Sequence, residues 1–501
     1  MSGNLYARFE QVFGANAPRI ALRSADGAAA LTFGGLARGA SRYANALGAL
    51  GVEPGDRVTV QAEKSVANVL LYLATLKVGA VYQPLNTAYT AAEVAYFVAD
   101  AQPKLIVCDP ARQAEMRALG DRSKVFAVVN LDQEGNGSLA TMAATMDDRH
   151  ETAPRDGDDL AGLLYTSGTT GRSKGAMITH ANLESNAGTL VDLWRITPGD
   201  TLLHALPIFH VHGLFVALNT AFLSAASTIW LNRFDVRAMI AAMPDATLMM
   251  GVPSFYTRLL AEPAFTGDTA RNMRLFISGS APLLADTHKA FQARSGHAIL
   301  ERYGMTETGM IASNPHDGAR VPGTVGFALP GVSVRIRGAQ PGVLEVTGPN
   351  VFKGYWRMPE KTREEFTADR WFITGDVGAI DAEGRVSIVG RARDLIISGG
   401  LNVYPKEIED ALDAIPHIGE SAVIGVPHPD FGEGVVAVVT ARTELPPEAE
   451  IIAALSASLA RFKVPKRIFE VAELPRNAMG KVQKAELRKR YAATFGSLSI
   501  M

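Results

Sequence analysis

A loop rich in glycine and hydroxyl residues carries the most distinctive chemistry in this sequence. Residues 165–175 read Y-T-S-G-T-T-G-R-S-K-G and follow an apolar run that is typical of a buried strand. Glycines let backbone N–H groups turn toward an anion, hydroxyl groups add donors, and Lys174 adds a positive charge. The pattern predicts a phosphate-binding loop that is not a Walker A loop, with a flexible polar loop as the alternative. Its candidate ligands are Thr166, Ser167, Gly168, Thr169, Thr170, Gly171 and Lys174.

Two carboxylates stand where they suit a nucleotide and its metal. Glu307 lies in E-R-Y-G-M-T-E-T (301–308), a segment that also offers an aromatic face at Tyr303 and a hydroxyl at Thr306. Mg²⁺ prefers carboxylate oxygens, and the alternative is a solvated glutamate in a surface turn. Asp376 follows a strand and a glycine turn, where a carboxylate can accept bonds from both ribose hydroxyls. The alternative for Asp376 is a strand-end ion pair, which is common.

Three basic side chains have no evident partner in the sequence. Lys481 lies in a glycine-containing loop near the end of the chain and, taken alone, is a solvated charge. Arg258 stands among apolar residues of a helical stretch, and a cation buried there needs an anion. Glu262, four residues further on, and a second carboxylate on a substrate are both open as that anion. His210 lies in A-L-P-I-F-H-V-H-G-L-F (205–215) and is either a core histidine or part of a binding pocket.

Alternating strand-like and helical segments separate these residues. R-V-T-V-Q-A (57–62) and K-L-I-V-C-D (104–109) are predicted strands, and residues 65–78 form a predicted helix. The alternation recurs over 160–310, which predicts parallel sheets covered by helices. From about residue 332 short strands with glycine turns predict a β-meander. A compact α+β segment follows, with a predicted helix over 447–461, and we place a domain boundary at Arg391–Asp394.

Composition narrows the class of protein and its surroundings. Of 501 residues, 47% are hydrophobic and 20% are charged, as in ordinary globular proteins. A formal net charge of −2 offers no basic excess for phosphates, so we expect no nucleic acid as a partner. The single cysteine, Cys108, excludes an intrachain disulfide and favours a reducing, cytoplasmic location. The uncharged segment from Gly213 to Leu231 contains polar residues and ends in a β-branched run. We interpret it as a buried helix and strand, and expect no membrane association.

Taken together, the motifs resemble those of the acyl-adenylate-forming superfamily, which comprises acyl-CoA synthetases, peptide-synthetase adenylation domains and luciferases. They occur in the order of that family and cover the chain from about residue 160 to the C-terminus. The resemblance implies an AMP-forming ligation that uses ATP and CoA as co-substrates and Mg²⁺ as cofactor. The motifs are T-S-G-T-T-G-R-S-K-G (166–175), G-S-A-P-L (279–283), E-R-Y-G-M-T-E-T (301–308), I-T-G-D (373–376), G-R-A-R-D-L-I (390–396) and P-R-N-A-M-G-K-V-Q-K (475–484).

The resemblance also implies a role for each matched residue. Tyr303 would stack on adenine, Glu307 would hold Mg²⁺, and Asp376 with Arg391 would bind the ribose. Lys481 would bridge the acid and the α-phosphate during adenylation. The predicted catalytic residues are therefore Lys481, Glu307, Thr166 and Lys174, and the other implied nucleotide contacts are Ser280, Ala281, Pro282, Glu301, Arg302, Gly304, Met305 and Thr306.

The fold implied is α/β and has two domains. A large N-terminal domain of βα sub-domains and a β-rich sub-domain spans residues 1–391 and holds the ATP and acid sites. Residues 392–394, with Arg393 and Asp394, form the implied hinge. A small mobile α+β C-terminal domain, residues 395–501, carries Lys481. In a second pose of that domain the Gly399–Gly400 loop would line the tunnel for CoA.

Sequence segments outside these motifs resemble those of the malonyl-CoA synthetases. Examples are E-K-S-V (63–66), V-Y-Q-P-L-N-T-A-Y-T (81–90) and V-F-K-G-Y-W-R-M-P-E-K-T (351–362). This resemblance implies malonate as the acid, with methylmalonate as a second substrate. Arg258 would bind the distal carboxylate, His210 and Ser280 would contact the acid, and Val211 and Met310 would be walls near C2.

Two alternatives and one regulatory hypothesis complete the predictions. A CoA ligase for a short monocarboxylic acid, and a non-catalytic nucleotide-binding protein of the same fold, are the alternatives. The chain departs from the family's sequence pattern at Gly309, Ile311 and Ala312, in a run that is more often rich in asparagine, and this bears on the identity of the acid. Because Lys481 lies in a loop that the sequence suggests is exposed, a lysine acetyltransferase acting there would remove the catalytic charge.

Overall fold

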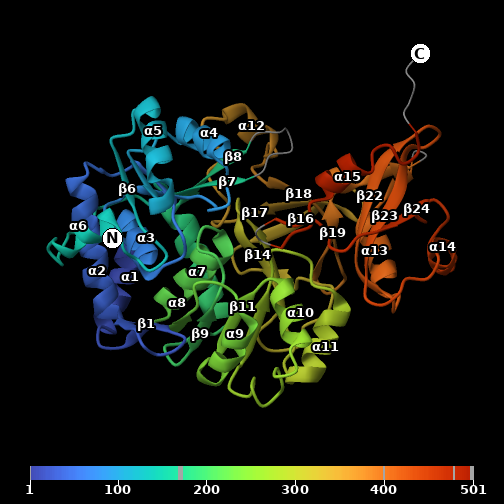
Figure 1. Ribbon diagram of the computed structural model, residues 1–501, viewed down its shortest axis with the longest axis horizontal. Helices are drawn as coiled ribbons and strands as arrows, with labels where there is room; N and C mark the ends of the chain where they lie inside the picture. The colour runs from blue at the N-terminus through green and yellow to red at the C-terminus, as the bar shows by residue number, and fades with distance from the viewer. Residues whose placement is uncertain (1, 167–172, 399–400, 478–479, 497–501) are drawn as a thin grey trace. The chain divides into compact units, whose positions relative to one another are not determined.

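The computed structural model describes residues 2–166, 173–398, 401–477 and 480–496 (Figure 1). The chain divides into two compact units. Unit 1 comprises Met1–Pro322, Gly326–Val334 and Val346–Phe372, and unit 2 comprises Gly323–Val325, Arg335–Glu345 and Ile373–Met501. The predicted boundary at 392–394 falls inside unit 2, at the 3₁₀ turn η4 (Ala392–Asp394), and stays a prediction.

Six strands form the first sheet of unit 1, in the order β6-β5-β3-β4-β7-β8. The strands from β3 to β7 pair in parallel, and β8 is antiparallel to β7. The strands predicted over 57–62 and 104–109 are confirmed as β3 and β5, and Cys108 is buried at the end of β5. The bounds are β3 Arg57–Gln61, β4 Val81–Pro84, β5 Leu105–Cys108, β6 Ala127–Asn130, β7 Leu160–Thr166 and β8 Lys174–Thr179.

Nine strands form the second sheet, in the order β15-β14-β13-β12-β11-β9-β10-β1-β2. Its central strands are parallel, while β2, β14 and β15 join the two ends in antiparallel pairing. The bounds are β1 Ile20–Ser24, β2 Ala30–Thr32, β9 Thr201–His204, β10 Ser227–Trp230, β11 Leu248–Gly251, β12 Leu275–Ser278, β13 Leu300–Met305, β14 Gly309–Ser313 and β15 Phe327–Ala328.

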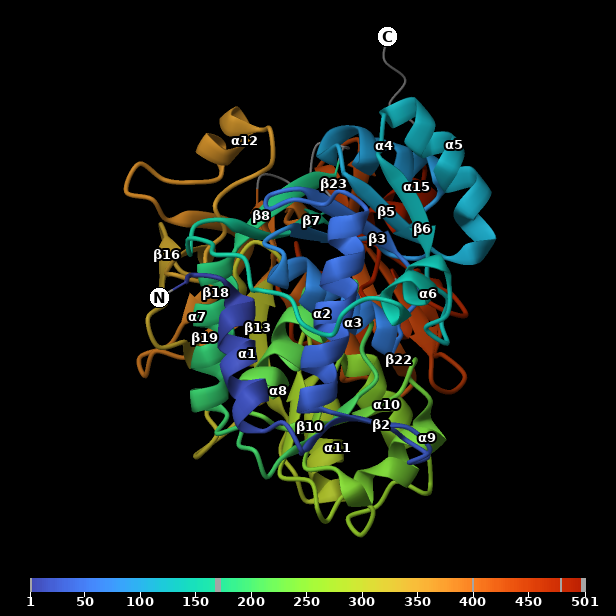
Figure 2. The ribbon, with the colours of Figure 1, turned by 90° about the vertical axis from the view of Figure 1, so that its left-hand side faces the viewer.

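The helices of unit 1 connect these strands. The helix predicted over 65–78 is confirmed as α3 (Val66–Lys77), and the Ser65 hydroxyl caps it by accepting from the Asn68 N–H. α3 lies beside α2 (Figure 2). The other bounds are α1 Leu5–Ala15, α2 Phe33–Ala49, α4 Ala91–Ala101, η1 Pro110–Arg112, α5 Gln113–Ser123, α6 Ser138–Ala144, α7 His180–Leu193, α9 Val236–Ala242, η3 Met243–Asp245, α10 Pro253–Ala261, α11 Ala285–Ser295 and α12 Pro359–Glu364.

The uncharged segment from Gly213 to Leu231 is buried in unit 1. It forms most of the π-helix η2 (His212–Leu218), then α8 (Asn219–Leu223) and strand β10. Nearly every residue in it is buried, which confirms the predicted buried helix and strand. Within the described part of the chain, no helix has the length and apolar character needed to cross a bilayer.

The second sheet brings the candidate acid-binding segments to one edge. His204 ends β9, Gly251 ends β11 and Ser278 ends β12. The carboxyl ends of neighbouring parallel strands meet at the same edge of a sheet, and this is where open α/β folds bind ligands. His210 and Ser280 follow two of these strand ends, so the order of strands places them in the same region.

Two further sheets belong mostly or wholly to unit 2. Four strands in the order β16-β17-β18-β19, with β18 and β19 antiparallel, agree with the predicted β-meander, and the remaining strands and helices confirm the α+β segment. The helix predicted over 447–461 ends at Ser456, whose hydroxyl donates to the carbonyl oxygen of Ile452. The bounds are β16 Ser333–Arg337, β17 Gly342–Thr347, β18 Phe372–Ile380, β19 Val386–Arg391, β20 Ile396–Ser398, β21 Leu401–Val403, α13 Pro405–Asp413, β22 Ile418–His428, β23 Gly432–Ala441, α14 Glu448–Ser456, β24 Arg467–Glu470 and α15 Lys484–Arg490.

Candidate active site

The two arms of the predicted phosphate loop are adjacent strands. Thr166 ends β7 and Lys174 begins β8, and the two residues are paired directly across the ladder. The predictions for Ser167, Gly168, Thr169, Thr170 and Gly171 lie outside the described residues. The β7–β8 hairpin therefore fixes the positions of Thr166 and Lys174 at the two ends of the loop.

A buried tyrosine links Lys174 to Glu307. The Glu307 carboxylate accepts the Thr166 hydroxyl at 3.1 Å and the Tyr355 hydroxyl at 3.2 Å, both on Oε1. The Lys174 ammonium lies 4.2 Å from the centre of the Tyr355 ring and 3.0 Å from a carboxylate oxygen of Glu365. The sequence analysis singled out neither Tyr355 nor Glu365: Tyr355 lies in the segment 351–362, whose resemblance implied no role for it, and Glu365 lies beyond that segment.

This arrangement fits the predicted magnesium site. Glu307 is 5% exposed and is oriented by two hydroxyl donors. The described residues contain no cluster of three or more His, Cys, Asp or Glu side chains that could hold a metal. Mg²⁺ is commonly bound by one or two carboxylates together with substrate phosphates rather than by an all-protein cage. The donor set around Glu307 matches that mode.

Two asparagine side chains hold the hairpin that carries Glu307. Asn186 on α7 accepts from the Met310 N–H at 3.0 Å and donates to the Met310 carbonyl at 2.9 Å. Asn350 donates to the carbonyl oxygens of Thr308 and Met310 at 2.8 and 3.0 Å. Gly309 has a φ of +57°, and a Cβ there would lie 2.5 Å from the Asn186 side-chain oxygen. A side chain at position 309 would therefore clash with Asn186 in this structure.

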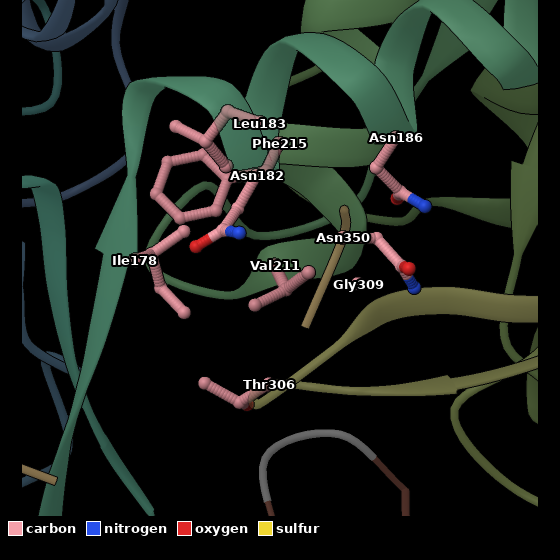
Figure 3. A pocket seen from close by; sticks show the side chains of 9 residues that line it. All are labelled: Ile178, Asn182, Leu183, Asn186, Val211, Phe215, Thr306, Gly309 and Asn350. Atoms are coloured by element: carbon pink, nitrogen blue, oxygen red, sulfur yellow. The ribbon is translucent and has the colours of Figure 1, made fainter. Parts of the chain in front are cut away.

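A small cavity lies behind the hairpin (Figure 3). Val211, one of the predicted walls, and Thr306 line it, while Met310, the other predicted wall, is buried beside it. Aliphatic and aromatic side chains form much of the lining, and three amides complete it. The remaining lining residues are Ile178, Asn182, Leu183, Asn186, Phe215, Gly309 and Asn350.

An arginine with unpaired donors lies near the predicted acid residues. Arg302 is 3% exposed, and its Nε and Nη2 atoms have no hydrogen-bond partner among the described residues. Burial lowers the pKa of Arg302 to about 9. The guanidinium packs on Gly279, where a Cβ would lie 2.4 Å from Cζ. A buried cation in this state is costly, so the position favours an anionic ligand.

Two histidines and a serine flank this arginine. The His212 Nδ1 atom lies 3.2 Å from the Ser280 hydroxyl, and Ser280 has a φ of +71°. The His212 N–H donates to Nδ1 of His210 at 3.3 Å. Burial, together with the charge of Arg302, lowers the pKa of His212 well below its usual value, so its ring is neutral. His210 and Ser280 thus both contact His212, and their contact with the acid stays a prediction.

The residues around Ser280 differ in exposure. Pro282 is exposed and Ala281 is half-buried, while Glu301 is buried and accepts from the Leu283 N–H at 3.3 Å. The half-buried members of the hairpin, on the strands and turn of β13–β14, are Tyr303, Gly304, Met305 and Thr306.

Arg258 is exposed on α10, so the expectation that it is buried is wrong. The helix buries Phe255, Tyr256 and Leu259, and Arg258 lies outside that face. Its guanidinium lies 5.9 Å from the centre of the Phe234 ring. Among the described residues no ion pair includes Arg258, which leaves its role toward a substrate as a prediction.

Unit 2 brings together its own predicted site residues. Asp376 and Arg391 are paired across β18 and β19, and the Arg391 Nε atom lies 2.7 Å from a carboxylate oxygen of Asp376. Lys481 is half-buried rather than exposed. Burial and the charge of Arg391 lower the pKa of Lys481 to about 8, partly offset by Asp376.

The predicted hinge also lies in unit 2. Arg393 and Asp394 are close enough to Lys481 to influence its pKa, and Arg488 on α15 donates to the Asp394 carboxylate at 2.7 Å. The predictions for Gly399 and Gly400 lie outside the described residues.

Comparison with known proteins agrees with this chemistry. A family model described as AMP-binding enzyme matches residues 9–356, and one described as AMP-binding enzyme C-terminal domain matches residues 407–481. The sulfoacetate–CoA ligase of Cupriavidus necator is 35% identical over 93% of this chain and 94% of that protein. The malonate–CoA ligase of Arabidopsis thaliana is 34% identical over 87% of this chain and 78% of that protein. The crystal structure of ATP-bound MatB from Rhodopseudomonas palustris is 53% identical, with 99% of this chain and 100% of that chain covered and a TM-score of 0.96.

Proposed function

The chain belongs to the AMP-binding enzyme family, and on that premise we propose that it is an AMP-forming malonate–CoA ligase. The reaction joins malonate to CoA through a malonyl-adenylate and releases AMP and pyrophosphate. Methylmalonate is the second substrate that we propose. The likeness to a malonate–CoA ligase and to MatB supports malonate as the acid. The buried Arg302 favours an acid that carries a second negative charge.

The unpaired guanidinium of Arg302 is the observation that carries this proposal. A monocarboxylic acid would use its only carboxylate for adenylation and leave the buried Arg302 donors without an anion. The distal carboxylate of malonate would supply one, and a charge-assisted contact of this kind is strong. We therefore assign the distal carboxylate to Arg302, with Ser280 and His210 along the acid, instead of to the exposed Arg258.

We assign the nucleotide chemistry to the remaining predicted residues. Lys174 would leave Glu365 to contact the ATP phosphates, and Glu307 would hold Mg²⁺, which neutralises phosphate charge when bound. Asp376 with Arg391 would bind the ribose, and Tyr303 would stack on adenine. Lys481 would offset the charge that develops as the carboxylate attacks the α-phosphorus. For the CoA step we keep the hinge at 392–394 and the Gly399–Gly400 loop as proposals.

A turnover assay with product mass spectrometry tests the proposal. The purified protein receives ATP, Mg²⁺, CoA and one acid from malonate, methylmalonate, succinate, acetate, butyrate and benzoate. We expect AMP and malonyl-CoA. AMP with an acetyl or butyryl thioester alone would instead establish a monocarboxylate ligase. No AMP with any acid would leave a non-catalytic nucleotide-binding protein.

Two arginine variants test whether Arg302 or Arg258 binds the distal carboxylate. We expect Arg302→Met to lower kcat/KM for malonate by about 100-fold, because a buried charged contact is lost. Arg258→Ala is the matched control and is expected to change kcat/KM for malonate less than about threefold, because exposed charges contribute little. The reverse pattern would return the distal carboxylate to Arg258.

Sulfoacetate is a second candidate acid, favoured by the likeness to a sulfoacetate–CoA ligase. It also carries a distal anion, a sulfonate, which Arg302 could pair with as it would with a carboxylate. Adding sulfoacetate to the panel separates the two, since only one thioester should dominate.

Two lesser proposals concern the setting of the reaction. The single buried cysteine supports a cytoplasmic location.

Acetylation of Lys481 by a lysine acetyltransferase would remove its charge, although Lys481 is less exposed than its sequence suggested. Mass spectrometry of the modified protein with activity measured alongside tests this, and full modification without loss of activity would reject it.

A further inference from the structure

Four buried basic side chains form a connected series in unit 1. Lys64, His204, His212 and Arg302 are each at most 6% exposed. Burial, and then the charge of Lys64, lowers the pKa of His204, and burial, and then the charge of Arg302, lowers the pKa of His212. Among the described residues, no ion pair with a carboxylate includes Lys64 or Arg302. The proposed acid site uses Arg302 and leaves Lys64 and His204 without a role.

Lys64 is fully coordinated by neutral acceptors. Its Nζ atom lies 2.8 Å from Nδ1 of His204, 3.1 Å from the His204 carbonyl oxygen and 2.6 Å from that of Leu231. The Trp230 ring centre is 4.2 Å away. Burial lowers the pKa of Lys64 well below its usual value. The two carbonyl oxygens can only accept, so Lys64 donates an N–H group to each of them.

The bond between Lys64 and His204 determines which ring nitrogen of His204 carries the proton. Nε2 of His204 lies 2.9 Å from the carbonyl oxygen of Gly213, an atom that can only accept, so Nε2 carries the proton. Nδ1 is then the unprotonated nitrogen, and it accepts from Lys64. Lys64 thereby fixes the tautomer that lets His204 donate to Gly213.

Gly213 connects this pair to the acid site. It lies in the first turn of η2, directly after His212, and a Cβ at Gly213 would lie 2.2 Å from the carbonyl oxygen of Pro207. The backbone is therefore confined at this point, and the donor from His204 holds its carbonyl. The same turn brings His212 within 3.2 Å of the Ser280 hydroxyl.

We propose that Lys64 is a positioning residue for acid recognition. By fixing the tautomer of His204, it holds the first turn of η2 and with it the contact between His212 and Ser280, near Arg302. The inference rests on the proposed function, which supplies the anionic acid. Lys64 itself touches no substrate, and its effect is carried through His204 and Gly213.

Steady-state kinetics of the full chain test this with malonate as the acid. We expect Lys64→Met to lower kcat/KM for malonate about tenfold, mainly through KM, with the KM for ATP unchanged. His204→Leu, which loses both the acceptor and the donor, is expected to act alike. The double variant is expected to be no worse than either single one, because both changes break one series of contacts. His204→Gln keeps an acceptor and a donor and is expected to retain more affinity for malonate than His204→Leu.

Lys77→Met is the matched control. Lys77 is buried like Lys64, with exposed fractions of 1% and 6%, and it is paired with Glu10 at the far end of α3 from Lys64. We expect Lys77→Met to lower the melting temperature without changing the KM for malonate.

Three results would overturn the inference. These are an unchanged KM for malonate in Lys64→Met, additive losses in the double variant, and equal KM values for His204→Gln and His204→Leu. The last comparison decides the matter if Lys64→Met does not fold. A wild-type protein that forms no thioester from malonate or sulfoacetate would overturn the proposed function instead.

Discussion

Residues of unit 2 determine the pKa of the Lys481 ammonium. Burial and the nearby Arg391 disfavour its charged form, and Asp376 favours it, which leaves a pKa of about 8. The usual value for lysine is higher, so Lys481 loses its proton within a range that is accessible to experiment. A residue proposed to offset negative charge works only while protonated.

We therefore expect adenylation to decline as pH rises. Below about pH 8 Lys481 is charged, and above it kcat/KM should fall about tenfold per pH unit. ATP–pyrophosphate exchange measured with malonate from pH 6.5 to 9.5 tests this. Lys481→Arg keeps its charge over this range, so any residual exchange should lose the decline. A wild-type profile that stays flat to pH 9.5 would contradict the assignment of Lys481.

The hydrogen bond from the Tyr355 hydroxyl to Glu307 can be tested by one substitution. Its hydroxyl donates to Glu307 at 3.2 Å while its ring faces Lys174. We expect Tyr355→Phe to keep the contact with Lys174 but to leave Glu307 less well oriented. The Mg²⁺ concentration for half-maximal ATP binding, measured by calorimetry, should rise about three- to tenfold.

Tyr82→Phe is the control for that change. Tyr82 is equally buried and donates to Asn68 at 2.7 Å, within the first sheet's packing. Its loss should reduce stability without moving the Mg²⁺ dependence. Equal Mg²⁺ titrations for Tyr355→Phe and wild type would show that the Tyr355 hydroxyl does not orient Glu307.

The β13–β14 hairpin is the element on which the site depends most. It carries Arg302, which we assign to the acid, and Glu307, which we assign to Mg²⁺, and α7 holds it through Asn186. Its turn requires a positive φ at Gly309, directly beside the Asn186 side chain. An added methyl group there meets two obstacles, backbone strain and a steric clash.

We expect Gly309→Ala to destabilise the protein by about 1–3 kcal/mol in urea unfolding, because both obstacles act at once. Asn186→Ala removes the clash, so the double variant should lose less than the two single losses combined. Gly188→Ala on the same helix is the control. A Cβ at Gly188 meets nothing within 4 Å, so this change should be neutral or stabilising. Additive losses at 186 and 309 would show that the clash is relieved by other means.

The elements also show which features the sequence could predict. β3, β5 and α3 follow from local patterns, since alternation, apolar runs and the Ser65 cap need no distant partner. The burial of Arg258 was predicted from its apolar neighbours, but the helix turns those neighbours inward and Arg258 outward. The unpaired state of Arg302 and the bridging role of Tyr355 depend on side chains brought together only by folding. No local signal in the sequence could reveal them.

At the scale of the whole molecule, the predicted machinery is divided between two units. Lys174, Glu307 and Arg302 belong to unit 1, and Asp376 and Lys481 belong to unit 2. For the two half-reactions that we propose, the hinge at 392–394 lies within unit 2, between Asp376 and Lys481 in the sequence. The proposed hinge at Asp394 carries an anchor of its own, the bond from Arg488 at 2.7 Å.

Proline at position 394 tests that hinge, because proline fixes φ near about −65°. We expect Asp394→Pro to retain ATP–pyrophosphate exchange within about threefold while malonyl-CoA formation falls by more than about tenfold, since the second half-reaction depends on a backbone change at the hinge. Asp394→Ala also loses the bond to Arg488 but leaves φ free, so it should keep both half-reactions. If the alanine variant loses malonyl-CoA formation as well, the ion pair and not the backbone rotation is what matters. If the proline variant keeps both half-reactions, the movement lies elsewhere, and the junction between Phe372 and Ile373, where the two units divide, becomes the place to restrain next.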